Sequence, residues 1–159
     1  MQELIALEEK HPEMADPNSP SQRVGGGVLE GFEKVEHRRM MLSLGNVFNL
    51  GDLRAFDERV RASGPNVRYV VELKIDGLAM SLIYRDGRFV QAVTRGDGNV
   101  GEDVSANIRT IPSIPMNIDL PGEVEIRGEV FMPKASFLRL NSEREAANEE
   151  QFATPRNAA

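Results

Sequence analysis

The sequence contains no cysteine, only two histidines and no long run of apolar residues. Without cysteine the chain cannot form a disulfide framework or a cysteine-based zinc site. The histidines, His11 and His37, are too few and too isolated for a metal cluster, which leaves surface or capping roles. No apolar run approaches the roughly 20 residues of a membrane span, and the N-terminus lacks the apolar stretch of a signal peptide. We therefore expect a soluble cytoplasmic protein with no membrane contact.

Basic residues are also scarce for a chain that would bind nucleic acid. There are 19 Lys and Arg against 25 Asp and Glu, which gives a net charge of −6. This balance argues against an electrostatic DNA clamp formed by this chain alone. The 159 residues leave room for one domain and little more, and a hydrophobic content of 40% allows a real core.

Helical spacing of apolar residues occurs in three parts of the chain. We expect helices over residues 2–11, over 50–62 with Asn49 as the N-cap, and over about 133–147, where a proline suits the first position. Residues 17–31 are rich in Pro, Ser and Gly, which predicts an extended connector.

Alternation of apolar and polar residues predicts four strands. They are expected at 67–75, 78–84, 89–94 and 123–131. The dipeptide Asp86-Gly87 is typical of a hairpin turn between the second and the third strand. The order of the elements has no βαβ rhythm, which favours an α+β fold with antiparallel strands over a doubly wound parallel sheet.

Two of the expected strands carry a charged face. Successive side chains of a strand point to opposite faces, so alternate residues share one face. The charged residues that share a face in this way are Glu72, Lys74 and Asp76 on one strand and Glu125, Arg127 and Glu129 on another. Two such strands make a charged groove plausible; the alternative is the solvated outer face of a half-buried sheet.

The string Gly96-x-Gly98-x-x-Gly101 has the glycine spacing of the dinucleotide-binding fingerprint. Its surroundings do not suit that fold, because the preceding strands look hairpin-linked and the following helix is cut short by Pro112. A tight polar loop is the favoured interpretation, with the Rossmann fold as the alternative.

Five motifs, in order and at compatible spacings, carry a resemblance to the bacterial NAD-dependent DNA ligase family. They are Met41-Leu42-Ser43-Leu44, Glu72-x-Lys74-Ile75-Asp76-Gly77, Thr94-Arg95-Gly96-Asp97-Gly98, Gly101-Glu102-Asp103-Val104 and Arg127-Gly128-Glu129. The resemblance runs from about Ser19 to Ala159, where Thr154-Pro155-Arg156-Asn157-Ala158-Ala159 also resembles a family segment. One departure is Met40, where many relatives place proline.

The resemblance implies an adenylation core of nucleotidyltransferase type. In that family a lysine, here Lys74, attacks the α-phosphate of NAD, releases nicotinamide mononucleotide and keeps AMP in a phosphoramide bond. The AMP then passes to the 5′-phosphate of nicked double-stranded DNA, with Mg²⁺ as the metal. A free lysine with a pKa of about 10.4 is almost fully protonated at pH 7, so the site must lower this pKa.

The resemblance also assigns roles to other residues. Ser43 and Leu44 would border the adenine, and Glu72 would accept a hydrogen bond from the adenine amino group. Arg95 would contact the ribose and phosphate side. Glu129 would hold a ribose hydroxyl or lie near Mg²⁺.

Two further residues, Asp76 and Arg156, are weaker candidates for supporting roles. Arg156 would contact a phosphate. The carboxylates of Glu72 and Asp76 would raise the pKa of a neighbouring lysine, so Glu72 is better interpreted as a ligand-binding group than as an activator.

The expected organisation is an N-terminal helix and connector over residues 1–36 and a partial adenylation domain over 37–159. By resemblance, a preceding domain that grips nicotinamide mononucleotide, and later domains of the same ligase, would lie outside this chain. We therefore expect a truncated core that is inactive alone. The alternatives are a non-catalytic adenosine-nucleotide-binding or interaction fragment and a lysine nucleotidyltransferase that uses ATP or GTP.

Overall fold

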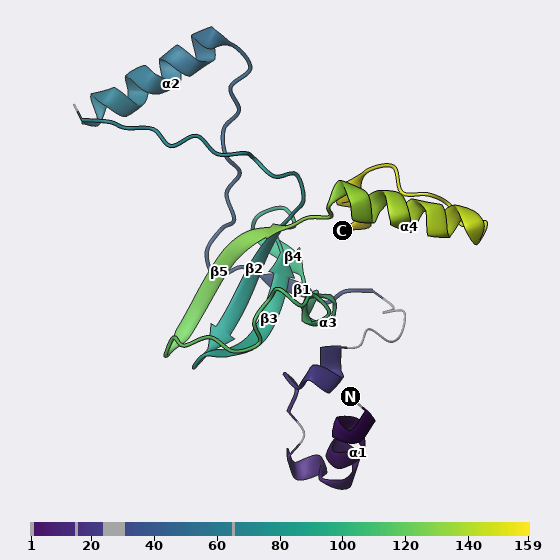
Figure 1. Ribbon diagram of the computed structural model, residues 1–159. Helices are drawn as coiled ribbons and strands as arrows, with labels where there is room; N and C mark the ends of the chain where they lie inside the picture. Colours follow the sequence, from purple (N-terminus) through teal and green to yellow (C-terminus); the bar gives the residue numbers. More distant parts are fainter. Residues whose placement is uncertain (1, 15, 24–30, 65) are drawn as a thin grey trace. The chain divides into compact units, whose positions relative to one another are not determined.

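The computed structural model describes residues 2–14, 16–23, 31–64 and 66–159. The chain forms two compact units: unit 1 comprises Met1–Met41 and Asp76–Ala159, and unit 2 comprises Leu42–Ile75. Helices and strands alternate irregularly along the chain, and the strands pair antiparallel (Figure 1), so the predicted α+β class is confirmed.

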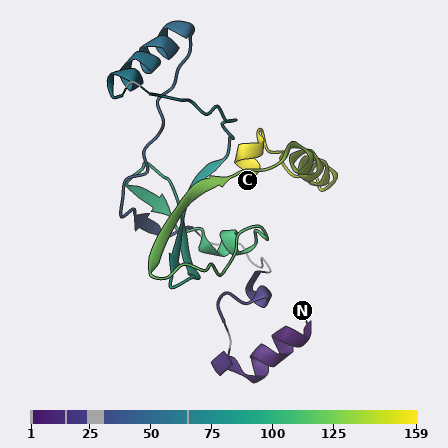
Figure 2. The ribbon, with the colours of Figure 1, turned by 60° about the vertical axis from the view of Figure 1, so that its left-hand side comes forward.

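Unit 1 is built around a three-stranded antiparallel sheet with the order β3-β2-β5 (Figures 1 and 2). The strands are β2 (Leu78–Arg85), β3 (Arg88–Thr94) and β5 (Glu123–Val130), close to the predicted ranges. Asp86 and Gly87 join β2 to β3 with φ of 47° and 78°. Two successive positive φ angles are typical of a type I′ hairpin turn, as predicted from this dipeptide.

A second sheet in unit 1 was not predicted. The short strands β1 (Lys34–Glu36) and β4 (Val100–Glu102) pair antiparallel, and an ion pair between Lys34 and Glu102 at 2.7 Å reinforces the pairing. Both strands have only three residues, too few to show alternation in the sequence.

One face of the larger sheet buries the core of unit 1. The core side chains are Met80, Tyr84, Phe89, Ala92, Val104, Ile108 and Met116. Ile108 comes from the short helix α3 (Ser105–Arg109). The buried Tyr84 hydroxyl donates to the Pro115 carbonyl at 2.9 Å, so the one polar atom of this ring is satisfied.

The N-terminal part of unit 1 contains α1 (Gln2–Lys10) and two 3₁₀ turns, η1 (Pro12–Met14) and η2 (Pro20–Arg23). Helix α1 was predicted. The extended connector predicted at 17–31 is wrong for residues 20–23, because these residues form η2. Residues 24–30 lie outside the described part of the chain. The neighbouring Asn18 side chain donates to the Phe89 carbonyl at 3.0 Å, so this region packs on the sheet instead of only linking elements.

The C-terminal part of unit 1 contains α4 (Lys134–Ala146) and α5 (Pro155–Ala158). Pro133 is the N-cap of α4 and not its first residue, a shift of one position from the prediction. The segment before α5 folds back on α4 through two hydrogen bonds between Asn141 and the Phe152 backbone, at 2.9 and 3.0 Å.

The described residues of unit 2 contain one helix, α2 (Leu50–Ala62), with the predicted bounds. The predicted N-cap is confirmed, because the Asn49 side chain accepts from the Asp52 amide at 3.0 Å. The strand predicted at 67–75 is wrong: these residues form no strand. Alternation reports which side chains could share a face, but a strand also needs a neighbour for its backbone N–H and C=O groups. Among the described helices of both units, none has the length and apolarity needed to cross a membrane.

Candidate functional site

The predicted site residues are divided between the two units. Ser43, Leu44, Glu72 and Lys74 lie in unit 2, whereas Asp76, Arg95, Glu129 and Arg156 lie in unit 1. The motif Lys74-Ile75-Asp76-Gly77 therefore crosses from one unit to the other. The expected convergence of Glu72, Lys74 and Glu129 on one groove stays a prediction, because it concerns both units.

Lys74 lies in an extended, exposed segment of unit 2. Val71 and Leu73 on one face are 93% and 91% exposed, and Glu72 and Lys74 on the other are also exposed, so neither face of this segment is covered within the unit. The segment is held to α2 by Tyr69, whose hydroxyl donates to Asp57 at 2.7 Å and whose ring lies 6.0 Å from that of Phe56. The hydrogen bond to Asp57 raises the pKa of Tyr69.

Gly77, the last residue of the lysine motif, is tied to strand β5. Its amide donates to the Glu129 carboxylate at 3.0 Å. A Cβ at this position would lie 2.2 Å from the Val130 carbonyl oxygen, closer than any real contact. Glycine is therefore required because the β5 backbone passes against it, and Glu129 lies beside the end of the motif.

The polar face predicted for β5 is confirmed. Glu125, Arg127 and Glu129 pair in register with Ile83, Ser81 and Ala79 of β2, opposite to the face that buries Met80 and Tyr84. The charged residues of β5 thus lie on the side of the sheet away from the main core.

The loop after β3 is a tight polar turn, as favoured from the sequence. Gly96 has a φ of 57°, and a Cβ there would lie 1.8 Å from the Val100 carbonyl oxygen. One Asp97 carboxylate oxygen accepts from the amides of Asn99 and Val100, both at 2.8 Å. These hydrogen bonds, with that from Val100 the strongest, lower the pKa of Asp97. The loop joins β3 of one antiparallel sheet to β4 of another, and neither sheet contains a parallel pair, so the Rossmann alternative is excluded.

The acidic motif that follows has a structural role in this chain. The Asp103 carboxylate accepts from the Ser105 amide at 2.8 Å and from the Gln91 side chain at 2.7 Å. Burial alone would raise the pKa of Asp103, but the hydrogen bonds from Ser105 and Gln91 outweigh it and the pKa is lowered. Asp103 fixes the start of α3 on β3.

A cavity of about 550 Å³ brings two of the predicted arginines together in unit 1. Leu78 and Ile108 contribute to its apolar lining, and its charged lining residues are Arg95, Glu102 and Arg156. Arg156 also lies 3.5 Å from the Asp76 carboxylate. Two guanidinium groups on one largely apolar cavity are suited to a phosphate or another anionic group.

The described residues offer little for a metal ion. They contain no group of three or more His, Cys, Asp or Glu side chains arranged to hold one. Magnesium bound with a nucleotide needs only one or two carboxylates, because phosphates and water supply the rest. Glu129 fits that mode, with one carboxylate oxygen on the Gly77 amide.

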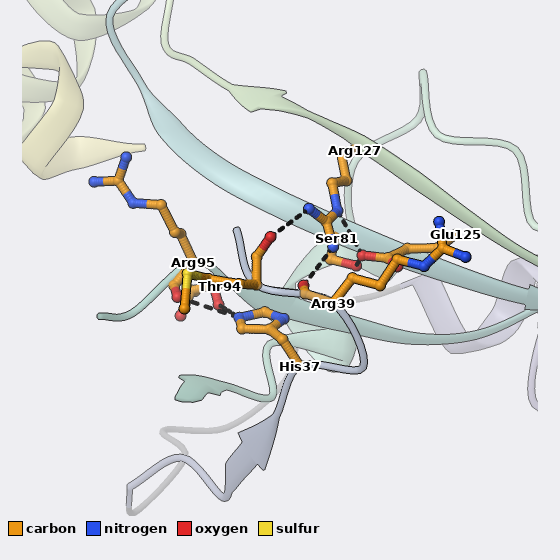
Figure 3. Close-up of polar contacts among 8 residues, drawn as sticks. His37, Arg39, Ser81, Thr94, Arg95, Glu125 and Arg127 are labelled. Atoms are coloured by element: carbon orange, nitrogen blue, oxygen red, sulfur yellow. Dashed lines mark hydrogen bonds and ion pairs between the residues drawn. The ribbon is translucent and has the colours of Figure 1, made fainter. Parts of the chain in front are cut away.

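Sequence reasoning assigned no site role to two residues that form a polar cluster in Figure 3. His37 contacts the carbonyls of Thr94 and Arg95, and Arg127 contacts Glu125 and two carbonyls of the segment after β1. Arg127 carried a signal in its position on the polar face of β5. His37 carried none beyond its expected surface or capping role.

Comparison with protein families gives two matches along the chain. Residues 29–159 match the family described as NAD-dependent DNA ligase adenylation domain. Residues 1–25 match the family described as DNA ligase-like, N-terminal NAD+-binding domain. The second match corrects the expectation that this NAD-gripping region lies entirely before the chain, since α1 falls within it.

Curated relatives agree with these matches. The chain is 60% identical to the DNA ligase of Bacillus subtilis (strain 168) over 160 residues and 61% identical to those of Bacillus velezensis and Halalkalibacterium halodurans. Each alignment covers the whole of this chain and 24% of the relative. The chain thus spans about a quarter of the length of the curated relatives it matches.

Proposed function

The chain belongs to the family of NAD-dependent DNA ligase adenylation domains, and from this premise we propose that Lys74 is the residue that accepts AMP from NAD. The observation that carries the proposal is the motif Lys74-Ile75-Asp76-Gly77 within the matched region. The last residue of this motif, Gly77, donates its amide hydrogen to the Glu129 carboxylate. The activity of a whole ligase would belong to a longer protein of which this chain is about a quarter.

The proposed step is nucleophilic substitution at phosphorus. The neutral amine of Lys74 attacks the α-phosphate of NAD, a P–N bond forms, and the bond to the bridging oxygen breaks. Nicotinamide mononucleotide leaves with the bonding electron pair, and the lysine nitrogen loses a proton to solvent or a base. A protonated lysine has no lone pair, so the site must favour the neutral amine through desolvation or nearby cations.

The remaining residues would bind and orient the dinucleotide. Ser43 and Leu44 would border the adenine and Glu72 would accept from its amino group. Arg95 and Arg156, which line one cavity, would contact the ribose and phosphate side. Preorganised cations of this kind stabilise charge that develops at phosphorus.

Glu129 and Asp76 complete the proposed site. Glu129 would hold a ribose hydroxyl or a Mg²⁺ ion that is bound mainly through phosphates and water. Asp76 would keep Arg156 in place through their ion pair. Nicked double-stranded DNA would be the acceptor of AMP, and other domains of a ligase would make most of the DNA contact, because this chain is acidic.

The test is a graft in which this chain replaces the matching 160 residues of the Bacillus subtilis DNA ligase. After incubation with NAD and Mg²⁺, intact-mass measurement should show an AMP adduct that peptide mapping places on Lys74. The variant Lys74→Arg keeps the charge but cannot be deprotonated, so its adduct should vanish. The matched control Lys134→Arg, at the exposed start of α4, should keep the adduct. An adduct that persists in Lys74→Arg would refute the assignment.

The same measurement on the chain alone distinguishes the fragment alternatives. We propose that the isolated chain forms no adduct and seals no nick, because it holds only part of the groups that align NAD. Binding of NAD without an adduct, observed by calorimetry, would support the adenosine-binding fragment. An adduct on Lys74 in the isolated chain would show that the matched quarter is sufficient for the first step.

A further inference from the structure

The segment of residues 37–41, which follows strand β1, is bound to unit 1 along its whole length. The His37 amide donates to the Asn99 carbonyl at 2.8 Å, and the Met41 amide donates to the Gly98 carbonyl at 2.9 Å. The Met41 side chain is buried. Both ends of the segment are therefore fixed on the loop that connects β3 to β4.

A single arginine holds the middle of this segment. The Arg127 guanidinium donates to the carbonyls of Arg39 and Met40, at 2.6 and 3.0 Å, and its Nε donates to Glu125 at 2.7 Å (Figure 3). The same Glu125 oxygen accepts from the Ser81 hydroxyl at 2.8 Å. Glu125 thus orients the guanidinium, whose planar fork can reach two successive carbonyls.

The charge of Glu125 is maintained by the same contacts. Burial alone would raise the pKa of Glu125, but the hydrogen bonds from Arg127 and Ser81 outweigh it and the pKa is lowered. Glu125 is therefore a carboxylate at neutral pH, and its contact with the Arg127 guanidinium is a charge-assisted hydrogen bond.

His37 extends the cluster to the loop that carries a predicted ligand-binding arginine. Its Nε2 lies 3.0 Å from the Thr94 carbonyl oxygen and 3.2 Å from the Arg95 carbonyl oxygen. Both partners are acceptors only, so Nε2 carries the proton and donates. Figure 3 shows the Arg95 side chain pointing away from Arg127, and this side chain lines the cavity shared with Arg156.

These contacts constrain where the chain leads. Ser43 follows Met41 by two residues, and each step between Cα atoms is about 3.8 Å, so anchoring Met41 limits the positions open to Ser43 and Leu44. We infer that Arg127 is a positioning residue for NAD binding: through residues 37–41 it restricts the adenine-bordering pair Ser43 and Leu44 while His37 restricts the backbone of Arg95. This inference rests on the proposed function. Arg127 itself contacts neither nucleotide nor reacting atoms.

The test uses the graft into the Bacillus subtilis ligase and measures the KM for NAD separately from the adenylation rate at saturating NAD. Arg127→Met should raise the KM by about tenfold or more with a smaller change in the saturated rate, since the lost interaction acts on binding geometry. Arg85→Met is the matched control, because Arg85 is an exposed arginine of the same sheet paired with Glu123. Its KM should stay within about twofold of the unmodified graft.

A second variant keeps the charge beside Glu125. Arg127→Lys provides a point charge without the planar fork, so it cannot reproduce contacts to two carbonyls and a carboxylate. Its KM should also rise, with circular dichroism and expression like those of the unmodified graft. A KM for NAD that is unchanged in both variants would overturn the inference. So would a lower saturated rate at constant KM, because a purely structural role lowers the amount of active protein without changing KM. Failure of the unmodified graft to form any adduct would instead reject the proposed function on which the inference rests.

Discussion

The two units differ in what holds them together. Unit 1 buries a cluster that includes Tyr84, Ala92 and Ile108 under a three-stranded sheet, whereas no described residue of unit 2 is buried. Unit 2 is shorter than the roughly 40 residues below which chains seldom fold without a disulfide, a metal or a partner. Its helix has a stripe of apolar residues, but Leu53 and Phe56 remain 50% and 39% exposed.

The difference matters because the proposed nucleophile lies in the unit without a core. Lys74 and Glu72 occupy an exposed segment that satisfies no strand pairing, while Glu129 and Arg95 lie on the well-packed unit. A motif that is easy to identify in the sequence is thus located where the local fold is weakest.

The largest expected effect comes from emptying the core of unit 1. Ile108→Ala leaves a cavity in the buried cluster that includes Phe89 and Met116, and it should lower the free energy of unfolding by about 2–5 kcal/mol. Leu73→Ala removes a side chain of similar size that is 91% exposed in unit 2, so it should change the free energy of unfolding by less than about 0.5 kcal/mol. Urea denaturation followed by circular dichroism measures both. Equal losses would contradict the division into a packed and an unpacked unit.

A somewhat smaller loss is expected at the junction of the units. Gly77→Ala forces a Cβ against the Val130 carbonyl and disturbs the hydrogen bond to Glu129, which should cost about 1–3 kcal/mol. Gly128→Ala is the control. Gly128 lies on β5, the strand of Val130, but a Cβ at Gly128 meets nothing within 4 Å. If the two variants unfold at the same urea concentration, the close approach of β5 to Gly77 is not real.

Acidification should weaken unit 1 through Glu125. Its pKa is lowered in the fold, so its stabilising contribution is present above its ordinary value of 4.5 and is lost as the pH falls through the lower folded value. The thermal midpoint of the wild type should therefore fall more steeply below pH 4.5 than that of Glu125→Gln. Glu58→Gln, on exposed α2 of unit 2, serves as the control and should follow the wild type. Parallel profiles for all three proteins would exclude this role of Glu125.

The smallest effect is local to unit 2. Hydrogen bonds from Arg61, the larger contribution, and from Tyr69 lower the pKa of Asp57. Tyr69→Phe removes one of them, so the pKa of Asp57 should rise while the unfolding of unit 1 is unchanged. An NMR titration of the carboxyl carbon measures this, with Phe56→Leu as a control that keeps both hydrogen bonds. An unchanged Asp57 titration in Tyr69→Phe would show that the Tyr69 hydroxyl does not bond to Asp57.

Local sequence signals were sufficient for much of the fold. The helix over 50–62, its Asn49 cap and the Asp86-Gly87 turn depend on residues within a few positions of one another, so their physics can be read from the sequence. The polar face of β5 was equally clear, because alternation along one strand decides which side chains share a face. The order and spacing of the five motifs also identified the family, which the match over residues 29–159 supports.

Other features depended on contacts between residues distant in the sequence. The strand expected at 67–75 did not form, because alternation does not supply a hydrogen-bonding partner. Strands β1 and β4 exist only through their mutual pairing, and the contacts of Arg127 with Arg39 and Met40 join segments almost ninety residues apart. The sequence alone determined the family to which the chain belongs and the residues that we propose for adenylation chemistry. Only the tertiary structure decided that Gly77 must be glycine and that Arg127 anchors residues 37–41, because backbone approach and hydrogen bonding across the fold leave no local trace in the chain.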